Sequence, residues 1–382
     1  MSVSSGDVSV HAILDRSRPQ PLRVVSAQDF HLGPAEAADI AEALANPSCL
    51  PYCVDSEFAA MLLVEMPEGV DIENAPFLYA EQHRLARRVF RVPLDMLTRY
   101  CLALPDPERL LLIHSTGRCG STLLTAALAE LPEVRTLSEP DVFTQGAMTG
   151  PVHEQRTRAT LAGVYRACLR LLCRASAPLH VIKLRSVAIE HADMIGAGMS
   201  GIRRLFLYRD AVAVAASTAR ILGRDPDDWI LTAQELRSWR PLAPLLPCGD
   251  EGASVDAYTL YAALWAGPVA AFLRASATQN GWIGSLRYED LCEDPPGALR
   301  ALLLRCDAAV RFPTDLPTAF NRDAQRGSML DRERVEASAS ERLRARVSGP
   351  AFAAAVVTAL RRLAPDLPID APLPDRLCAA AD

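Results

Sequence analysis

The sequence LLLIHSTGRCGSTLLTAALAEL, residues 110–131, predicts a strand, a loop and a helix in direct succession. Residues 110–114 form an apolar run of strand length, and residues 121–131 place leucines on one face of a helix. The connecting residues 115–120 are small except for one arginine. A short loop of this kind turns several backbone N–H groups toward one point, where the helix dipole adds partial positive charge. The stretch therefore predicts a phosphate-binding loop.

The loop differs from the one that binds nucleoside triphosphates. That version follows the pattern G-x-x-x-x-G-K-[ST], and its lysine reaches the β- and γ-phosphates. Here Ser115 takes the place of the first glycine, Gly120 is the second, and Ser121 stands where the lysine belongs. Triphosphate cleavage is therefore poorly supported. A basic residue does occur, but it lies inside the loop at Arg118.

The segment RCGSTLL, which begins at Arg118, resembles the 5′-phosphosulfate loop of sulfotransferases, which use 3′-phosphoadenosine 5′-phosphosulfate (PAPS). In the cytosolic branch of that family a tryptophan stacks on the adenine five positions after the basic residue. This chain has Leu123 there, so its adenine pocket is expected to differ. The resemblance implies that the 5′-phosphosulfate group is held by Arg118, Cys119, Gly120, Ser121 and Thr122.

Two later segments resemble the residues that bind the 3′-phosphate in the same family. A strand-like apolar run precedes Arg209, and Ser217 follows eight positions later. Arginine makes bidentate charge-assisted bonds to phosphate, and a serine two helical turns on can donate to the same anion. Farther along, AQRGSML at 324–330 resembles the basic-glycine loop that closes on the 3′-phosphate, which implies this role for Arg326 and Gly327.

A fourth segment, LRYEDLCEDP at 286–295, resembles the strand-end segment of the family whose tyrosine lies by the adenine. The resemblance implies this position for Tyr288. All four matches occur in the order that the family requires and extend over well over half of the chain. The chain therefore resembles the PAPS-dependent sulfotransferases.

Two predicted strand ends supply catalytic candidates. Glu139 stands 21 positions after Arg118, where tyrosylprotein sulfotransferases and similar bacterial members have a catalytic glutamate, so the resemblance implies that it is the general base. Lys183 ends the next strand and is the single lysine among 40 basic residues. The resemblance implies that Lys183 assists the transition state and that Arg118 stabilises the leaving oxygen. Cytosolic sulfotransferases have a catalytic histidine two positions after this lysine, but Arg185 stands there and a guanidinium stays protonated.

Strands that alternate with helices predict an α/β fold in which helices flank both faces of a central parallel sheet. This is the three-layer P-loop-type arrangement, with the phosphate loop at the carboxyl edge of the sheet. Pro105-Asp106-Pro107 predicts a boundary between an N-terminal accessory region, residues 1–104, and a sulfotransferase-like domain, residues 105–382. The accessory region is expected to shape acceptor choice. Residues 225–250 look like an insertion that forms an acceptor lid or a packing excursion.

The elements of the accessory region are predicted from local patterns alone. Residues 1–25 are expected to be a poorly ordered lead, residues 34–46 a short helix and residues 74–90 a longer helix. Beyond that region, residues 331–347 predict one charged helix. The helix at 74–90 would carry a basic stripe, which is either a solvated face or a contact for an acidic or phosphorylated acceptor or a carrier protein. Its members are His83, Arg84, Arg87, Arg88 and Arg91.

Composition excludes several classes of protein. Half of the residues are hydrophobic, which indicates a globular chain, and the net charge of −6 gives no bulk basic character for nucleic acid or a membrane surface. The ten cysteines have no zinc-type spacing, and no metal is expected because Arg and Lys would supply the charge that magnesium gives to kinases. The N-terminus lacks a signal-peptide pattern, and no apolar run approaches the roughly 18 residues of a membrane helix, which predicts a cytoplasmic protein.

These residues and the resemblance together imply a sulfotransferase that moves a sulfuryl group from PAPS to a hydroxyl acceptor. The products would be 3′-phosphoadenosine 5′-phosphate (PAP) and a sulfate ester. The acceptor is expected to be a small-molecule or carrier-bound hydroxyl, and a saccharide or a peptide tyrosine stays open.

Two alternatives remain. A P-loop kinase with an aberrant loop would bind ATP and magnesium, but it lacks the loop lysine and has no role for Arg209 and Ser217. A sulfotransferase-fold protein would bind nucleotide or a partner without catalysis, although Arg118, Glu139 and Lys183 are all present.

Overall fold

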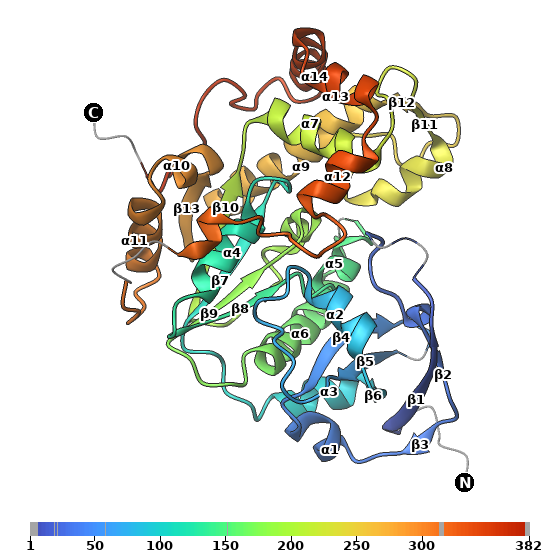
Figure 1. Ribbon diagram of the computed structural model, residues 1–382. Helices are drawn as coiled ribbons and strands as arrows, with labels where there is room; N and C mark the ends of the chain where they lie inside the picture. The colour runs from blue at the N-terminus through green and yellow to red at the C-terminus, as the bar shows by residue number, and fades with distance from the viewer. Residues whose placement is uncertain are drawn as a thin grey trace.

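Two sheets formed by successive parts of the chain organise the structure (Figure 1). The blue N-terminal strands form one sheet, and the strands of the other sheet lie between it and the helices of the second half of the chain. The computed structural model describes residues 7–18, 20, 22–57, 59–150, 152–312 and 317–378.

Five parallel strands form the central sheet, in the order β13–β10–β7–β9–β8. All residues of β7, the middle strand, are buried, as expected for a strand that is covered on both faces. This sheet confirms the predicted α/β fold. The strand bounds are β7 Leu110–Ser115, β8 Val134–Ser138, β9 Leu179–Lys183, β10 Ile202–Tyr208 and β13 Trp282–Arg287.

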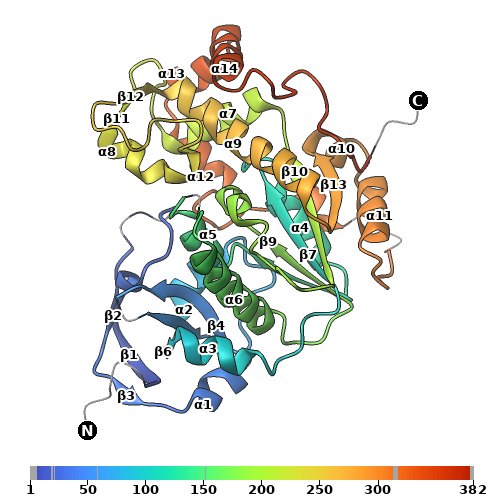
Figure 2. The same ribbon diagram turned by 180° about the vertical axis from the view of Figure 1, so that it is seen from behind.

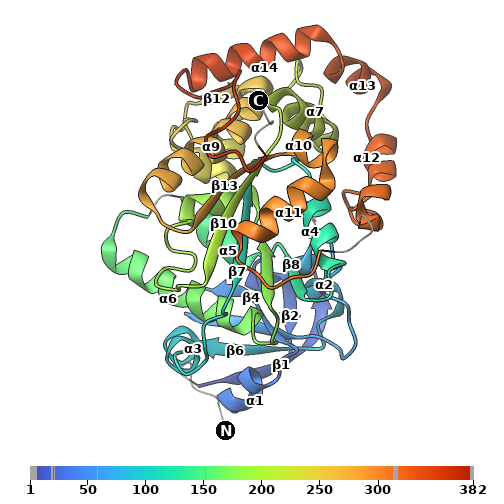
Figure 3. The same ribbon diagram turned by 90° about the vertical axis from the view of Figure 1, so that its left-hand side faces the viewer.

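Helices cover both faces of the parallel sheet and complete three layers (Figure 3). On one face, α4 and α11 bury leucines such as Leu124 and Leu299 in one hydrophobic cluster with β7 and β10. On the other face, α6 packs beneath β7 and β9, and α9 packs against β10 through Phe272 and Phe206. The bounds are α4 Ser121–Ala129, α6 Gln155–Leu172, α9 Ala257–Thr278 and α11 Pro295–Arg305.

The segment predicted to be an insertion, residues 225–250, forms a small packed unit against α9 together with the residues that directly follow it. It contains an antiparallel hairpin of β11 Ile230–Thr232 and β12 Ser254–Asp256, together with α8 Ala233–Leu236. Leucines of this unit share a hydrophobic cluster with Leu260 of α9. The other helices of the second half are α5 Val142–Ala147, α7 Ala211–Leu222, α10 Tyr288–Glu293, α12 Arg332–Ser338, α13 Glu341–Val347 and α14 Pro350–Leu363.

The N-terminal region forms an antiparallel sheet in the order β2–β1–β6–β5–β4, with β3 paired to β1. Buried residues of this sheet share one hydrophobic cluster with α6, which lies between the two sheets (Figure 2). Its elements are β1 Ser9–Arg16, β2 Phe30–Leu32, β3 Glu36–Ala37, α1 Ile40–Ala45, β4 Cys49–Asp55, β5 Ala60–Glu65, α2 Leu78–Leu85, β6 Arg88–Pro93 and α3 Leu94–Cys101.

Several local predictions for this region are wrong. Residues 1–25 were predicted to be poorly ordered, but they include β1, which pairs with both β2 and β6. The predicted helix at 34–46 is only the short α1, preceded by β3. The predicted helix at 74–90 ends at Leu85, because the next residues pair with β1 and β5 as strand β6. Strand pairing, which is a long-range effect, overrides the local helical pattern here.

The predicted basic stripe therefore does not exist as one helical face. Arg84 lies on α2, whereas Arg88 and Arg91 lie on β6 and pair with Glu65 of β5 and Asp55 of β4. The prediction of a single charged helix at 331–347 is also wrong, because the structure has two helices there, α12 and α13. Ser340 lies at the break, and its side chain accepts a hydrogen bond from the first turn of α13.

Candidate functional site

A cavity of about 1070 Å³ lies at the carboxyl ends of the parallel strands. Every residue from Ser115 to Leu123 lines it, so the predicted phosphate loop is at the predicted edge of the sheet. Ligands of open α/β sheets bind at this edge, because the loops that follow the strands converge there. The volume is slightly above the usual range for small-molecule sites, which is roughly 300–1,000 Å³.

The loop backbone adopts the left-handed conformation at three positions. The φ angles are +73° at Gly117, +52° at Arg118 and +80° at Gly120. Gly120 is also the N-cap of α4, so no side chain from that position caps the first helical turn. The N–H groups of this turn and the helix dipole are therefore available to an anion in the cavity.

Tyr288 lies directly against the loop. A β-carbon added to Gly120 would stand only 2.3 Å from the Tyr288 Cδ2 atom, so the ring can approach only a glycine. The Arg209 guanidinium stacks over the Tyr288 ring, with its Cζ atom 4.5 Å from the ring centroid. The structure thus brings together three residues that were singled out from distant parts of the sequence.

Lys183 and Glu139 meet at the ends of β9 and β8. The Lys183 Nζ atom lies 2.8 Å from the Glu139 Oε1 atom and donates to the Thr122 Oγ1 atom at 3.1 Å. Only 1 % of the Lys183 side chain is exposed. Glu139 has a φ of +56°, and its N–H donates to the Lys183 carbonyl at 2.7 Å. The lysine therefore links the predicted base to the phosphate loop.

A second ion pair continues this cluster. The Arg185 Nε atom lies 3.3 Å from the Glu139 Oε2 atom and 3.0 Å from the Asp141 Oδ1 atom. Asp141 is fully buried, and burial raises its pKa. This effect outweighs Arg185 and a hydrogen bond from Thr144, which lower the pKa. Sequence reasoning missed Asp141. Its position in the sequence could have indicated it. Asp141 follows Glu139 by two residues, just as Arg185 follows Lys183 by two residues after the adjacent parallel strand.

Arg118, Ser217 and Arg209 all line the cavity. The Arg118 Nε atom donates to the Ser217 Oγ atom at 3.0 Å, and its guanidinium also contacts the side-chain amide of Gln325 at 3.3 Å. Burial lowers the pKa of Arg118, and Arg209 and Arg220 lower it further, although a guanidinium remains protonated in proteins. The Nε atom of Arg209 is buried and has no hydrogen-bond partner among the described residues, although Arg209 lines the cavity.

The last predicted segment lies beside the cavity, and only part of it contributes to the wall. Gln325 and Leu330 line the cavity, whereas Arg326 and Gly327 do not. The Gly327 N–H donates to the Asp331 Oδ2 atom at 2.7 Å. Cys119 also differs from its neighbours, because its side chain is buried in the core and burial raises its pKa. Only the backbone of Cys119 can serve an anion.

The charge of the cavity wall contrasts with the net charge of −6 for the chain. Three acidic residues line it among the described residues: Glu139, Asp323 and Glu336. No histidine does so in the same set. Seven basic residues line it: Arg118, Lys183, Arg185, Arg209, Arg220, Arg322 and Arg332. The excess of positive charge favours an anionic ligand.

The described residues include neither a metal-binding cluster nor a membrane-spanning helix. Among the residues that the structure describes, no group of three or more His, Cys, Asp or Glu side chains could hold a metal ion. No described helix combines the length and apolar character needed to cross a membrane.

Comparisons with solved structures give distant similarities, whereas comparisons of the sequence give no match. No protein-family model matches the chain, and no curated protein matches its sequence. Among solved structures, a sulfotransferase domain from the curacin biosynthetic pathway aligns with a TM-score of 0.35 and 16 % sequence identity. The alignment covers 61 % of this chain and 83 % of that domain.

The contact between Gly120 and Tyr288 predicts a stability difference between two glycine variants. Gly120→Ala and Gly69→Ala both place a side chain at a left-handed position, with φ angles of +80° and +76°. Such a position costs a non-glycine residue roughly 1–2 kcal/mol. The Gly69 site has open space around it, whereas the Gly120 site has the Tyr288 ring. Urea unfolding should show a clearly larger loss of unfolding free energy for Gly120→Ala, and equal losses would contradict the packing described here.

Proposed function

We propose that this protein transfers a sulfuryl group from PAPS to a hydroxyl acceptor, giving PAP and a sulfate ester. The observation that carries the proposal is the buried Lys183–Glu139 pair, which is joined to the phosphate loop through Thr122. It places a cation and a carboxylate side by side where a group held by the loop would react.

Three features support the fit of an anionic nucleotide such as PAPS. The first turn of α4 offers backbone N–H groups from Gly120, Ser121 and Thr122 for the 5′-phosphate. The buried Nε atom of Arg209 lacks a partner, as expected for a donor that waits for the 3′-phosphate. Ser217 lines the same cavity and accepts a hydrogen bond from Arg118, and the volume of about 1070 Å³ leaves room for an acceptor.

Sulfuryl transfer is an in-line displacement in which charge develops on the transferred group and the leaving oxygen. Catalysis then depends on positioning and on cations that stabilise this charge, as in phosphoryl transfer. An ammonium has three N–H donors, and Lys183 uses two of them for Glu139 and Thr122. The third is available to an oxygen of the sulfuryl group or to the bridging oxygen. Arg118, which lines the same cavity, adds a second positive charge.

Glu139 is the proposed general base. It would accept the proton of the acceptor hydroxyl as the oxygen attacks sulfur, a contribution of roughly 10²–10⁴-fold. Of the three acidic residues on the wall, only Glu139 lies against Lys183. Arg185 cannot replace it in this role because a guanidinium does not release its proton near neutral pH.

One observation favours phosphoryl transfer as a second candidate. Lys183 reaches the loop from β9 and contacts Thr122, so it approaches the region that the missing loop lysine of a kinase would occupy. Against this candidate, the pair of Arg209 and Ser217 has no role in binding ATP.

Replacement of Glu139 tests the base. Glu139→Gln should lower the turnover of PAPS to PAP by about 10²–10⁴-fold, because the amide cannot accept the proton. Ion-pair chromatography of PAP released in the presence of a mixture of phenols and alcohols measures this rate. Glu336→Gln is the matched control, since Glu336 lines the same cavity but lies far along the chain on α12. Full turnover of Glu139→Gln would remove the base assignment.

Replacement of Arg209 tests the nucleotide site. Arg209→Ala should weaken PAP binding by roughly 10- to 150-fold, which corresponds to a charged hydrogen bond of about 1.5–3 kcal/mol. Titration calorimetry with PAP gives the dissociation constant. Arg203→Ala is the control, because Arg203 lies on β10, the strand that directly precedes Arg209, but does not line the cavity. Unchanged affinity in Arg209→Ala would overturn the assignment of the 3′-phosphate site.

A further inference from the structure

Two cations at the end of β9 face two aromatic rings of the N-terminal region. The Lys183 Nζ atom lies 5.2 Å from the centroid of the Phe77 ring, and the Arg185 Cζ atom lies 4.3 Å from the centroid of the Tyr79 ring. The two rings stack on each other with centroids 5.8 Å apart. Both distances between cation and ring are in the range of cation–π attraction. Phe77 and Tyr79, which are two residues apart, thus face Lys183 and Arg185, which are also two residues apart.

The rings cover the cations from the side of the N-terminal sheet. Both line the cavity, yet Phe77 is only 4 % and Tyr79 only 1 % exposed. They therefore keep water away from one side of Lys183 and Arg185. Electrostatic attraction is stronger where water is excluded, so the rings strengthen the ion pairs with Glu139 as well as restricting their geometry.

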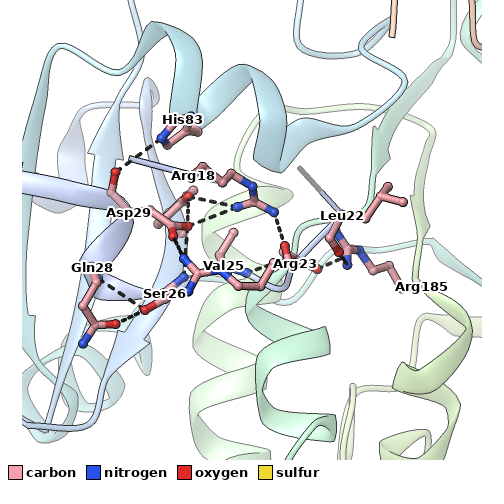
Figure 4. Close-up of polar contacts among 11 residues, drawn as sticks. Arg18, Leu22, Arg23, Val25, Ser26, Gln28, Asp29, His83 and Arg185 are labelled. Carbon is pink, nitrogen blue, oxygen red and sulfur yellow. Dashed lines mark hydrogen bonds and ion pairs between the residues drawn. The ribbon is translucent and has the colours of Figure 1, made fainter. Parts of the chain in front are cut away.

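The segment of residues 22–25, near the N-terminus, also contacts the Arg185–Asp141 pair. The Arg185 Nη1 atom donates to the Leu22 carbonyl at 2.9 Å (Figure 4). The Val25 N–H donates to the Asp141 Oδ2 atom at 3.0 Å. One short segment thus bonds to both members of the Arg185–Asp141 pair.

The same segment is fixed to the N-terminal sheet. Asp29 is fully buried and accepts ion pairs from Arg18, at 3.1 Å, and from Arg23, at 2.5 Å (Figure 4). The hydroxyl of Tyr52 on β4 also donates to Asp29 at 2.7 Å. The contacts to Arg185 and Asp141 therefore come from an anchored part of the fold.

We propose that Phe77, Tyr79 and Arg185 are positioning residues, through which the N-terminal region holds Lys183 and Glu139 in their reactive arrangement. This inference rests on the proposed sulfuryl transfer. It makes the N-terminal region a part of the catalytic machinery, in addition to any effect on acceptor choice. A displacement of about 1 Å in such a pair can lower turnover by about 10²-fold.

Four variants of the full chain test the proposal. Phe77→Leu and Tyr79→Leu remove one ring each, and Tyr79→Phe keeps the ring while removing the hydroxyl. Phe90→Leu is the matched control, because Phe90 is a fully buried ring of the same region that stacks on Arg88, 4.9 Å away, and does not line the cavity.

The kinetic readout uses PAPS with water as the acceptor. The bond from sulfur to the 5′-phosphate oxygen breaks, a bond from sulfur to the water oxygen forms, and a proton passes to Glu139. The products, PAP and sulfate, are separated by chromatography. The two leucine variants should lower kcat by about 10- to 100-fold, with PAP affinity within about twofold of the parent. Tyr79→Phe keeps the ring over Arg185 and should therefore lower kcat less than Tyr79→Leu does, and Phe90→Leu should keep nearly the parent kcat.

The single lysine allows a direct structural readout. Labelling with ¹³Cε-lysine gives one side-chain resonance, from Lys183, in NMR spectra. Loss of the ring over the ammonium removes a ring-current shift, so Phe77→Leu should move this resonance downfield and Phe90→Leu should leave it in place. If a leucine variant does not fold, Arg185→Lys replaces it, because it keeps the charge and loses the fork that joins Leu22 to the two carboxylates. Its kcat should fall with PAP affinity kept.

The outcomes separate the two proposals. A parent protein that binds no PAP and releases none from PAPS refutes the proposed function and, with it, the positioning role. An active parent with unchanged kcat in both leucine variants refutes the positioning role alone. Equal loss in Phe90→Leu would also refute it, because the effect would then come from general destabilisation.

Discussion

The geometry of the candidate site depends on the buried ion pair between Lys183 and Glu139. Removing an ammonium from water costs several kcal/mol, and the cost is offset only where good partners surround it. Here the partners are a carboxylate, the Thr122 hydroxyl and the face of the Phe77 ring. Each comes from a different element, so one cation joins β8, β9, the phosphate loop and the N-terminal region.

The identity of the cation follows from the same constraint. All the other 39 basic residues are arginines, yet this position has a lysine. An ammonium is compact and can approach Glu139 and the loop at once, whereas a guanidinium is a broad planar fork. The backbone also shows the demands of the site, because Arg118 and Glu139 both adopt left-handed φ angles. Such conformations cost of order 1–3 kcal/mol for a non-glycine residue and tend to occur where function requires them.

The sequence was sufficient to predict the parts of this site that depend on local order. The apolar runs at 110–114 and 179–183 are strands of the parallel sheet, and the loop after the first of them lies at its carboxyl edge. Parallel strands bring their ends together, which explains why Glu139 and Lys183, predicted separately at two strand ends, meet in the structure. Arg209 and Ser217 reach the cavity for the same reason.

The parts that the sequence did not reveal depend on contacts between distant segments. The contacts of Phe77 and Tyr79 with β9 join residues more than a hundred positions apart, and no local pattern indicates them. Residues 88–93 become a strand because β1 and β5 pair with them, although their pattern is also compatible with a helix. Arg326 and Gly327 were expected at the cavity from a short motif, yet the wall is formed by their neighbours.

The most direct test of the central claim, that the cavity is built for a 3′-phosphorylated adenine nucleotide, is thermal unfolding with PAP, with ATP plus magnesium and with neither. A ligand at about 100 times its dissociation constant stabilises the native state by roughly 2.7 kcal/mol, which is visible as a raised unfolding midpoint. The account predicts a clear shift with PAP and little with ATP plus magnesium. A shift with ATP plus magnesium alone would contradict it and favour a kinase.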